Sequence, residues 1–399
     1  MRRAALALLL SLSLACGDAD LAPLDASVDA PPIARDARPR EDAGPPPEDL
    51  EGFVRWHMEA GGILGLAAAV TTPDRTVVTL TLGEAREGVP VDEHTQFVLA
   101  SISKTFAATA VFQAVEDGAL ALDAPLEDVL GHPARNPAFP DVPVTIRMLL
   151  THTSGLRDDL GALGVASTAG ADPTTSLGTF AQEYLADPGH WGSEPGTEYD
   201  YSNAGYGIAG AVVEAATDRD FRDYTEERIF APLMLDGAAW FIGDLDLSRV
   251  ATPHTWNART GFRELEHDGL AYYPADTLRV SIAGMARYAR AVSRGLELDG
   301  VRVLSEASFT ELVRAPFPEL ARSQAHGWGR AGLAGRSWLH HSGATSGGST
   351  QIYVGDDGVS IVLLTNSDAY IRNLFGLTAG ADALRAILER LESEARLVP

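Results

Sequence analysis

The chain contains one cysteine and one lysine in 399 residues. Because Cys16 is the sole cysteine, no intramolecular disulfide can form in any redox compartment. All 31 basic residues except Lys104 are arginine. A guanidinium cannot lose its proton near neutral pH, whereas an ammonium in suitable surroundings can. The single lysine therefore points to a role that requires a deprotonatable amine.

Positive charge is scarce as well, with 31 basic against 55 acidic residues and a net charge of −24. A surface of this kind repels the phosphates of nucleic acids and anionic lipid headgroups. We therefore expect no nucleic-acid partner, and we expect membrane contact only through an N-terminal lipid anchor.

The N-terminal residues 1–15 have the layout of a secretory signal peptide. Two arginines precede an apolar run from Ala4 to about Ala15, which is too short to span a bilayer. Cys16 follows "SLA", as in a bacterial lipoprotein signal, although Ser13 stands where leucine is usual. We expect export, lipidation of Cys16 and a location on the periplasmic or cell-surface side; cleavage with free secretion is the alternative.

Residues 16–49 are rich in Pro, Asp and Ala and contain no aromatic residue. Such a segment cannot bury enough apolar surface to offset chain entropy, which predicts a flexible, disordered tether. The rest of the chain, 50–397, has a globular composition and is expected to form one domain.

Local patterns predict a sheet built from both ends of that domain. Residues 63–71 and 75–83 read as one hairpin, and residues 349–355 and 359–366 read as another. Residues 381–395 have apolar side chains at helical spacing. We expect a sheet region at about 50–105 and 300–397, and a helical region at about 106–299.

Ser101 and Lys104 open a predicted helix that runs from about Ser101 to about Gly118. Residues three apart share a helix face, so both side chains should point the same way. The positive field at a helix N-terminus favours proton loss from a lysine, and its free N–H groups can bind an oxyanion. These are the requirements of an activated serine nucleophile. A serine beside a lysine also arises by chance, so the interpretation depends on further clusters.

Two clusters follow in order along the chain. "YSN" at Tyr201–Asn203 is predicted to begin on a loop and continue into a helix, and "HSG" begins at His341 on a predicted strand. With S-x-x-K, these motifs resemble the serine β-lactamase and penicillin-binding superfamily. "PVTIRMLLTHTSGLRD" and "IFAPLMLDGAAW" are similar to its class C β-lactamase-related branch, which includes D-alanyl-D-alanine carboxypeptidases and serine esterases. The resemblance covers roughly residues 52 to 395.

The resemblance implies an α/β (α+β) fold of the β-lactamase/transpeptidase type: an antiparallel sheet flanked by helices plus a mostly helical subdomain. It also implies that Ser101 is acylated, that Lys104 accepts its proton, and that Tyr201 serves the leaving group or the deacylating water. Asn203 would hold the substrate amide and the lysine. The implied substrate-binding residues are Asn203, His341, Ser342, Gly343 and Ala344, with the N–H groups of Ser101 and Ala344 as oxyanion hole. No metal or organic cofactor is implied.

From the residues alone, other interpretations stay open: Tyr201 as core, Asn203 as a helix cap and Gly343 as a turn residue. His152, in "THTSGL", is interpreted as part of a turn. The third motif has histidine where relatives have lysine, so its cation would be weaker and pH-dependent. Arg330 or Arg336 is a candidate for supplying the missing charge.

We therefore predict an extracytoplasmic serine hydrolase that forms an acyl-enzyme on Ser101. The expected substrate is a small molecule or peptide, an acyl donor such as a D-alanyl peptide, an ester or a β-lactam. A D-alanyl-D-alanine carboxypeptidase-like enzyme or a related esterase or amidase is favoured. The alternatives are a true β-lactamase and a non-catalytic penicillin-binding or sensor module.

Overall fold

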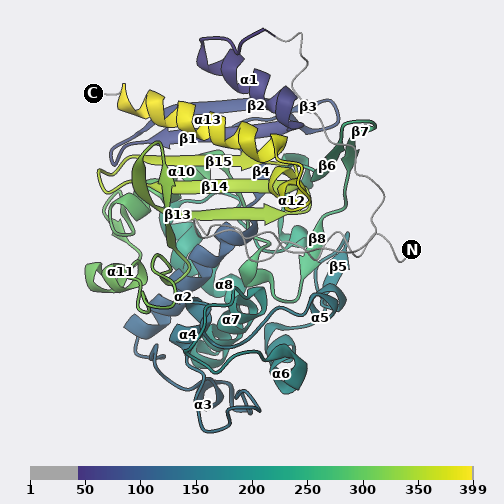
Figure 1. Cartoon of the computed structure of the whole chain (residues 1–399). Helices are drawn as coiled ribbons and strands as arrows, with labels where there is room; N and C mark the ends of the chain where they lie inside the picture. Colours follow the sequence, from purple (N-terminus) through teal and green to yellow (C-terminus); the bar gives the residue numbers. More distant parts are fainter. Residues whose placement is uncertain (1–43, 398–399) are drawn as a thin grey trace.

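The structure, a computed structural model, describes residues 44–397 (Figure 1). The predicted signal peptide, Cys16 and residues 17–43 of the predicted tether lie outside the described residues. None of the helices within 44–397 is long and apolar enough to cross a membrane.

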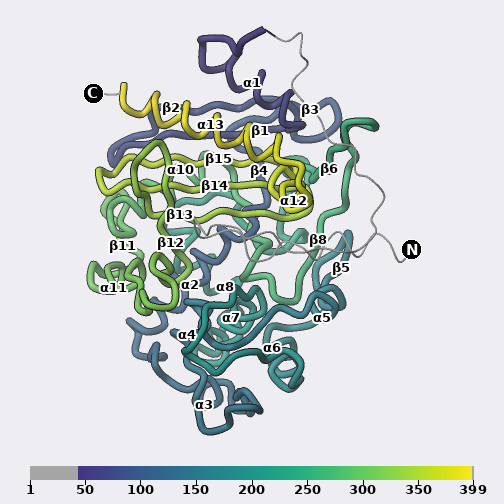
Figure 2. The backbone as a smooth tube through the Cα atoms, in the orientation of Figure 1, coloured from purple at the N-terminus to yellow at the C-terminus, as the bar shows by residue number. Residues whose placement is uncertain are grey.

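A seven-stranded antiparallel sheet joins the two ends of the domain. Its strands, in spatial order, are β12 (Gly329–Leu333), β13 (Arg336–Thr345), β14 (Gly348–Val354), β15 (Ser360–Thr365), β1 (Gly65–Thr71), β2 (Thr76–Arg86) and β3 (Val89–Pro90). Figure 2 shows β1 and β15, from opposite ends of the chain, side by side. Both predicted hairpins are confirmed, because β1 pairs with β2 and β14 pairs with β15.

Helices cover both faces of this sheet. Leu66, Ala68 and Val70 of β1 belong to a core cluster with α1 (Leu50–Gly61) and α13 (Ala379–Arg396), whereas Ala67 and Ala69 face the larger core that includes α10 (Ile282–Ser293). Side chains of a strand alternate between faces, so a central strand buried on both sides is apolar throughout. The predicted C-terminal helix and the predicted antiparallel sheet flanked by helices are confirmed.

A mostly helical region lies below the sheet in the view of Figure 1. Four two-stranded sheets, β4–β9, β5–β8, β6–β7 and β10–β11, lie outside the main sheet. The remaining elements are β4 (Gln96–Val98), α2 (Ser103–Glu116), α3 (Leu126–Leu130), α4 (Ile146–Leu150), α5 (Leu160–Val165), β5 (Ser167–Ala169), α6 (Leu177–Ala186), α7 (Asn203–Thr217), α8 (Phe221–Thr225), α9 (Ala231–Leu233), β6 (His254–Asn257), β7 (Gly261–Glu264), β8 (Asp268–Leu270), β9 (Arg279–Ser281), β10 (Glu297–Leu298), β11 (Val301–Arg302), α11 (Glu306–Leu312) and α12 (Ala369–Leu374).

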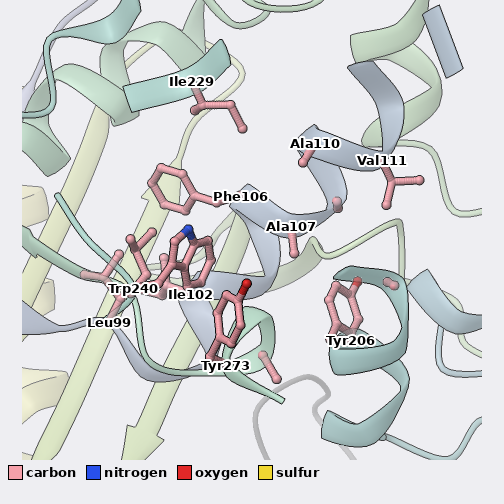
Figure 3. Close-up of a cluster of buried hydrophobic side chains, with 14 of the residues drawn as sticks. Leu99, Ile102, Phe106, Ala107, Ala110, Val111, Tyr206, Ile229, Trp240 and Tyr273 are labelled. Carbon is pink, nitrogen blue, oxygen red and sulfur yellow. The ribbon is translucent and has the colours of Figure 1, made fainter. Parts of the chain in front are cut away.

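Helix α2 forms the centre of the molecule. Every residue from Ser103 to Ala114 is buried, as expected of a helix that neighbours enclose on all sides. Phe106 stacks on Tyr288 of α10 at 4.0 Å between ring centroids. Figure 3 shows Phe106 in the same cluster as Ile229 and Trp240. The packing holds the N-terminus of α2 between the sheet and the helical region.

Candidate active site

Ser101 lies on a tight turn in front of α2. The predicted helix start near Ser101 is confirmed to within two residues: Ala100–Ile102 form a 3₁₀ turn, and α2 itself runs from Ser103 to Glu116. Ala100, just before Ser101, has a φ of +50°, in the left-handed region that non-glycine residues rarely adopt. A strained backbone of this kind occurs at functional sites, where the surrounding packing maintains it.

The Lys104 side chain reaches back to Ser101 and is completely buried. Its Nζ lies 3.0 Å from Ser101 Oγ, 2.6 Å from Asn203 Oδ1 and 2.8 Å from the carbonyl oxygen of Ala275. The amide and carbonyl oxygens can only accept hydrogen bonds. They can therefore take the two N–H groups of a neutral amine, whose lone pair then faces the Ser101 hydroxyl. This is the geometry of a general base beside its nucleophile.

Tyr201 and Asn203 come from the start of α7. Tyr201 is 4% exposed, and Lys104 Nζ lies 4.9 Å from the centroid of its ring. The helix cap is Ser202 rather than Asn203, since the Ser202 hydroxyl accepts a hydrogen bond from Gly205 N at 3.0 Å. The Asn203 side chain is thus available to bind Lys104. As predicted, the triplet begins on a loop and continues into a helix.

Asp158 is a positioning residue that the sequence reasoning missed. Its carboxylate accepts hydrogen bonds from Ser202 Oγ at 3.0 Å, Asn203 N at 2.8 Å and Ala204 N at 3.0 Å. Burial raises the pKa of this carboxyl, while these hydrogen bonds act to lower it. A carboxylate at a helix N-terminus is also favoured by the helix dipole. Asp158 therefore holds the segment that carries Tyr201 and Asn203, and no local spacing signals this contact.

His152 packs directly against Tyr201, the candidate catalytic tyrosine. Its ring stacks on that of Tyr201 at 4.2 Å between centroids, and its Nδ1 accepts a hydrogen bond from Ser202 N at 3.0 Å. Burial lowers the pKa of His152 well below its usual value, so the ring is a neutral support for Tyr201. As predicted from "THTSGL", His152 lies in a turn, but the motif does not indicate its contact with Tyr201.

The third motif forms the opposite wall on β13, a strand as predicted. β12 pairs with β13 from Arg336 to His340, and beyond His340 that edge of β13 has no strand partner among residues 44–397. Gly343 lies within the strand, not in a turn. A Cβ at this position would lie 2.2 Å from the carbonyl oxygen of Leu99. That carbonyl also accepts a hydrogen bond from Thr350 Oγ1 at 2.7 Å, so the sheet packs directly on the nucleophile segment. Ala344 follows at this edge, and its oxyanion role stays a prediction, as does the role of Ser342.

His341 is neutral in this environment. Burial and the nearby Lys104 lower the pKa of His341 to about 3, and its Nδ1 lies 2.7 Å from the carbonyl oxygen of Ser342. The weak, pH-dependent cation expected at this position is therefore not available near neutral pH. Neither arginine candidate replaces it. Arg330 pairs with Asp356, and Arg336 pairs with Asp357 and Glu392.

The neighbouring His340 is buried as well, and the effect of its burial on stability can be measured. His340 Nε2 lies 2.6 Å from Gln351 Oε1, and burial lowers the pKa of His340 to about 4. In the unfolded chain the pKa is about 6.5. The unfolded state therefore binds more protons, and the free energy of unfolding falls as pH drops from about 6.5 to about 4. His340→Gln keeps an N–H donor for Gln351 and removes this titration.

We expect the loss of unfolding free energy between pH 7 and pH 5 to be about 1 to 2 kcal/mol smaller in His340→Gln than in the wild type. Denaturant titrations at the two pH values measure it. His94→Gln, at an exposed histidine, is the matched control and should follow the wild type. An unchanged loss in His340→Gln would show that His340 is not held neutral by the fold.

Comparisons with known proteins agree with this geometry. The family description "Beta-lactamase" matches residues 50–382. The chain is 31% identical over 312 residues to penicillin-binding protein 4 of Amycolatopsis lactamdurans, covering 73% of this chain and 80% of that protein. It is 33% identical over 216 residues to D-aminopeptidase of Brucella anthropi, covering 53% of this chain and 39% of that protein.

The fold has close counterparts among solved structures. D-amino acid amidase from Ochrobactrum anthropi SV3 superposes with a TM-score of 0.69 at 23% identity, covering 86% of this chain and 98% of that chain. The predicted β-lactamase/transpeptidase-like fold is thus confirmed. Family match, relatives and fold agree, and the chain belongs to the beta-lactamase family of serine hydrolases.

Proposed function

We propose that the protein hydrolyses a small ester or amide that carries no carboxylate near its scissile bond. One observation carries this choice: the third motif has a buried, neutral His341 in the place of a permanent cation. A carboxylate on the substrate would lose the ion pair that a lysine offers at that position. The family's acyl chemistry itself does not require such a carboxylate.

The proposed reaction uses Ser101, Lys104 and Tyr201 in turn. Lys104 Nζ takes the proton of Ser101 as Oγ attacks the carbonyl carbon, and the oxyanion is bound by the N–H groups of Ser101 and Ala344. The proton passes through Tyr201 to the leaving group as its bond to carbon breaks. Water then attacks the acyl-enzyme, and its proton passes through Tyr201 and Lys104 to Ser101 Oγ as the ester bond breaks and the acid leaves.

A D-alanyl-D-alanine carboxypeptidase-like activity is the second candidate. The similarity to penicillin-binding protein 4 over most of both chains favours it. We further propose, from the N-terminal pattern, that the protein is exported and anchored through a lipid on Cys16, with the domain held on the periplasmic or cell-surface side.

Intact mass spectrometry of the protein, together with assays of p-nitrophenol release and penicillin consumption, separates these candidates. The purified protein is mixed with p-nitrophenyl acetate or with benzylpenicillin, with Ser101→Ala as control. We expect p-nitrophenol release that depends on Ser101 and little penicillin turnover. A long-lived penicillin adduct on Ser101 would favour the carboxypeptidase-like function, and rapid penicillin consumption would indicate a β-lactamase. Failure to hydrolyse any of these acyl donors would contradict the proposal.

A further inference from the structure

His341 lies on the face of β13 that meets the nucleophile segment. Side chains of a strand alternate between its two faces, so His341 and Gly343 share one face. A Cβ on Gly343 would lie 2.2 Å from Leu99 O, which places that face against the turn that carries the nucleophile. Ser101 and Tyr201 are each 4% exposed, so the low exposure of His341, 1%, is common to the whole site.

The hydrogen bond at Nδ1 determines which nitrogen of the His341 ring carries the hydrogen. Nδ1 lies 2.7 Å from the carbonyl oxygen of Ser342. A carbonyl oxygen can only accept a hydrogen bond, so Nδ1 must be the donor. In a neutral imidazole the second nitrogen then has a lone pair and no hydrogen. Nε2 of His341 is therefore a hydrogen-bond acceptor.

The ring is neutral because no counterion compensates a charge on it. Among residues 44–397, the histidines within ion-pair distance of a carboxylate are His94 and His190. A buried charge without a partner is strongly disfavoured. Burial and the ammonium of Lys104 accordingly lower the pKa of His341. The third motif thus offers a lone pair to the site where a lysine would offer a cation.

This lone pair has no hydrogen-bond donor in the described part of the chain. Nε2 of His341 is a buried atom without a hydrogen-bond partner there. Buried polar atoms are nearly always hydrogen-bonded in native structures, and an exception at a functional site calls for a ligand, an ion or a water molecule. An acceptor does not attract a carboxylate, which is itself only an acceptor. The missing partner is therefore a group that donates a hydrogen bond.

We propose that His341 Nε2 accepts a hydrogen bond from an uncharged N–H or O–H group on the leaving group of the substrate. A carboxypeptidase substrate has its carboxylate on the leaving amino acid, and the donor group would take the place of that carboxylate. The preferred acyl donors then have leaving groups that end in a primary amide or a hydroxyl and not in a free acid. This inference rests on the proposed hydrolytic function and specifies its substrate class.

The kinetic test compares three acetate esters in both enantiomeric forms: O-acetyl-lactamide, methyl O-acetyl-lactate and O-acetyl-lactate. They share the acyl group and differ only at the end of the leaving group, which is an N–H donor, a methyl ester without a donor, or a carboxylate. A site built around a hydrogen bond discriminates strongly against analogues that cannot make it. We expect kcat/KM for acetate release from one enantiomer of the amide to exceed both other values by about tenfold or more.

Substitutions at His341 separate the acceptor from a cation. His341→Leu removes the acceptor and should bring the amide and the methyl ester within about threefold of each other. His341→Lys offers only donors and should reverse the order of amide and carboxylate. His340→Gln, on the opposite face of β13, is the matched control and should keep the wild-type ratios. Thermal melting establishes folding. A wild-type ratio of amide to methyl ester below about threefold, or a preference that survives in folded His341→Leu, would overturn the acceptor role.

Nitrogen-15 NMR of the histidine rings tests the acceptor without turnover, in Ser101→Ala. We expect His341 to carry its hydrogen on Nδ1 at pH 7, and His152 to carry it on Nε2, because His152 Nδ1 accepts from Ser202 N. O-acetyl-lactamide should shift the Nε2 signal of His341, and methyl O-acetyl-lactate should not. A hydrogen on His341 Nε2, or equal shifts with the two esters, would contradict the inference. Absence of acetate release from all three esters in the wild type would contradict the hydrolytic function instead.

Discussion

Lys104→Arg is expected to lower kcat/KM on p-nitrophenyl acetate by about 10³-fold or more, close to the loss caused by Ser101→Ala. Removing a general base or a nucleophile costs losses of this order, and the two are not additive because they act as a unit. The double variant should therefore be no worse than Ser101→Ala. Stopped assays of p-nitrophenol release, corrected for spontaneous hydrolysis, measure all three proteins.

The reason lies in the contacts of Nζ. Lys104 is 0% exposed and sits between one hydroxyl and two acceptor oxygens. An arginine can donate to the same oxygens, but its permanently charged guanidinium has no lone pair for the Ser101 proton.

Lys104→Met serves as the matched control. It keeps a long side chain without any amine, and it should be as inactive as Lys104→Arg if proton transfer is the lost function. Circular dichroism and thermal melting establish folding in each case. Turnover within tenfold of the wild type in a folded Lys104→Arg variant would contradict the general-base role.

Gly343→Ala is expected to reduce both stability and turnover although it adds a single methyl group. The new Cβ would lie 2.2 Å from Leu99 O and from Thr350 Oγ1, and 3.0 Å from the Ala100 Cβ. Backbone of the nucleophile segment must shift, and overpacking of this kind costs about 1–3 kcal/mol. A displacement of about 1 Å between Ser101 and the oxyanion donors costs about 10²-fold in kcat. Thermal melting and initial rates give the two quantities.

Gly332→Ala on β12 is the control for Gly343→Ala. An added Cβ there meets no described atom within 4 Å, so the variant should melt and turn over like the wild type. If Gly343→Ala behaved in the same way, the close contact between β13 and the nucleophile turn would not exist in solution.

Local patterns were sufficient for much of the fold. Both hairpins, the C-terminal helix and the strand position of His341 follow from alternation and helical spacing within a few residues. The left-handed conformation of Ala100 did not follow, because the packing around the nucleophile segment maintains it. A propensity pattern carries no information about that constraint.

Long-range contacts explain what the sequence could not reveal about the site. Asp158 lies 45 residues before Asn203 in the sequence, and only the fold brings the two together. Single carboxylates in a chain with 55 acidic residues have no distinguishing signal. The neutrality of His341 was likewise hidden, since burial rather than residue type sets its pKa.

The pairing of β1 with β15 also determines when this domain can form. Leu66 pairs with Thr365 near the far end of the chain, so the central part of the sheet stays incomplete until almost the whole polypeptide is available. Contacts of such large sequence separation slow folding. Synthesis from the N-terminus thus leaves β1 without its β15 neighbour until the last part of the chain has been made.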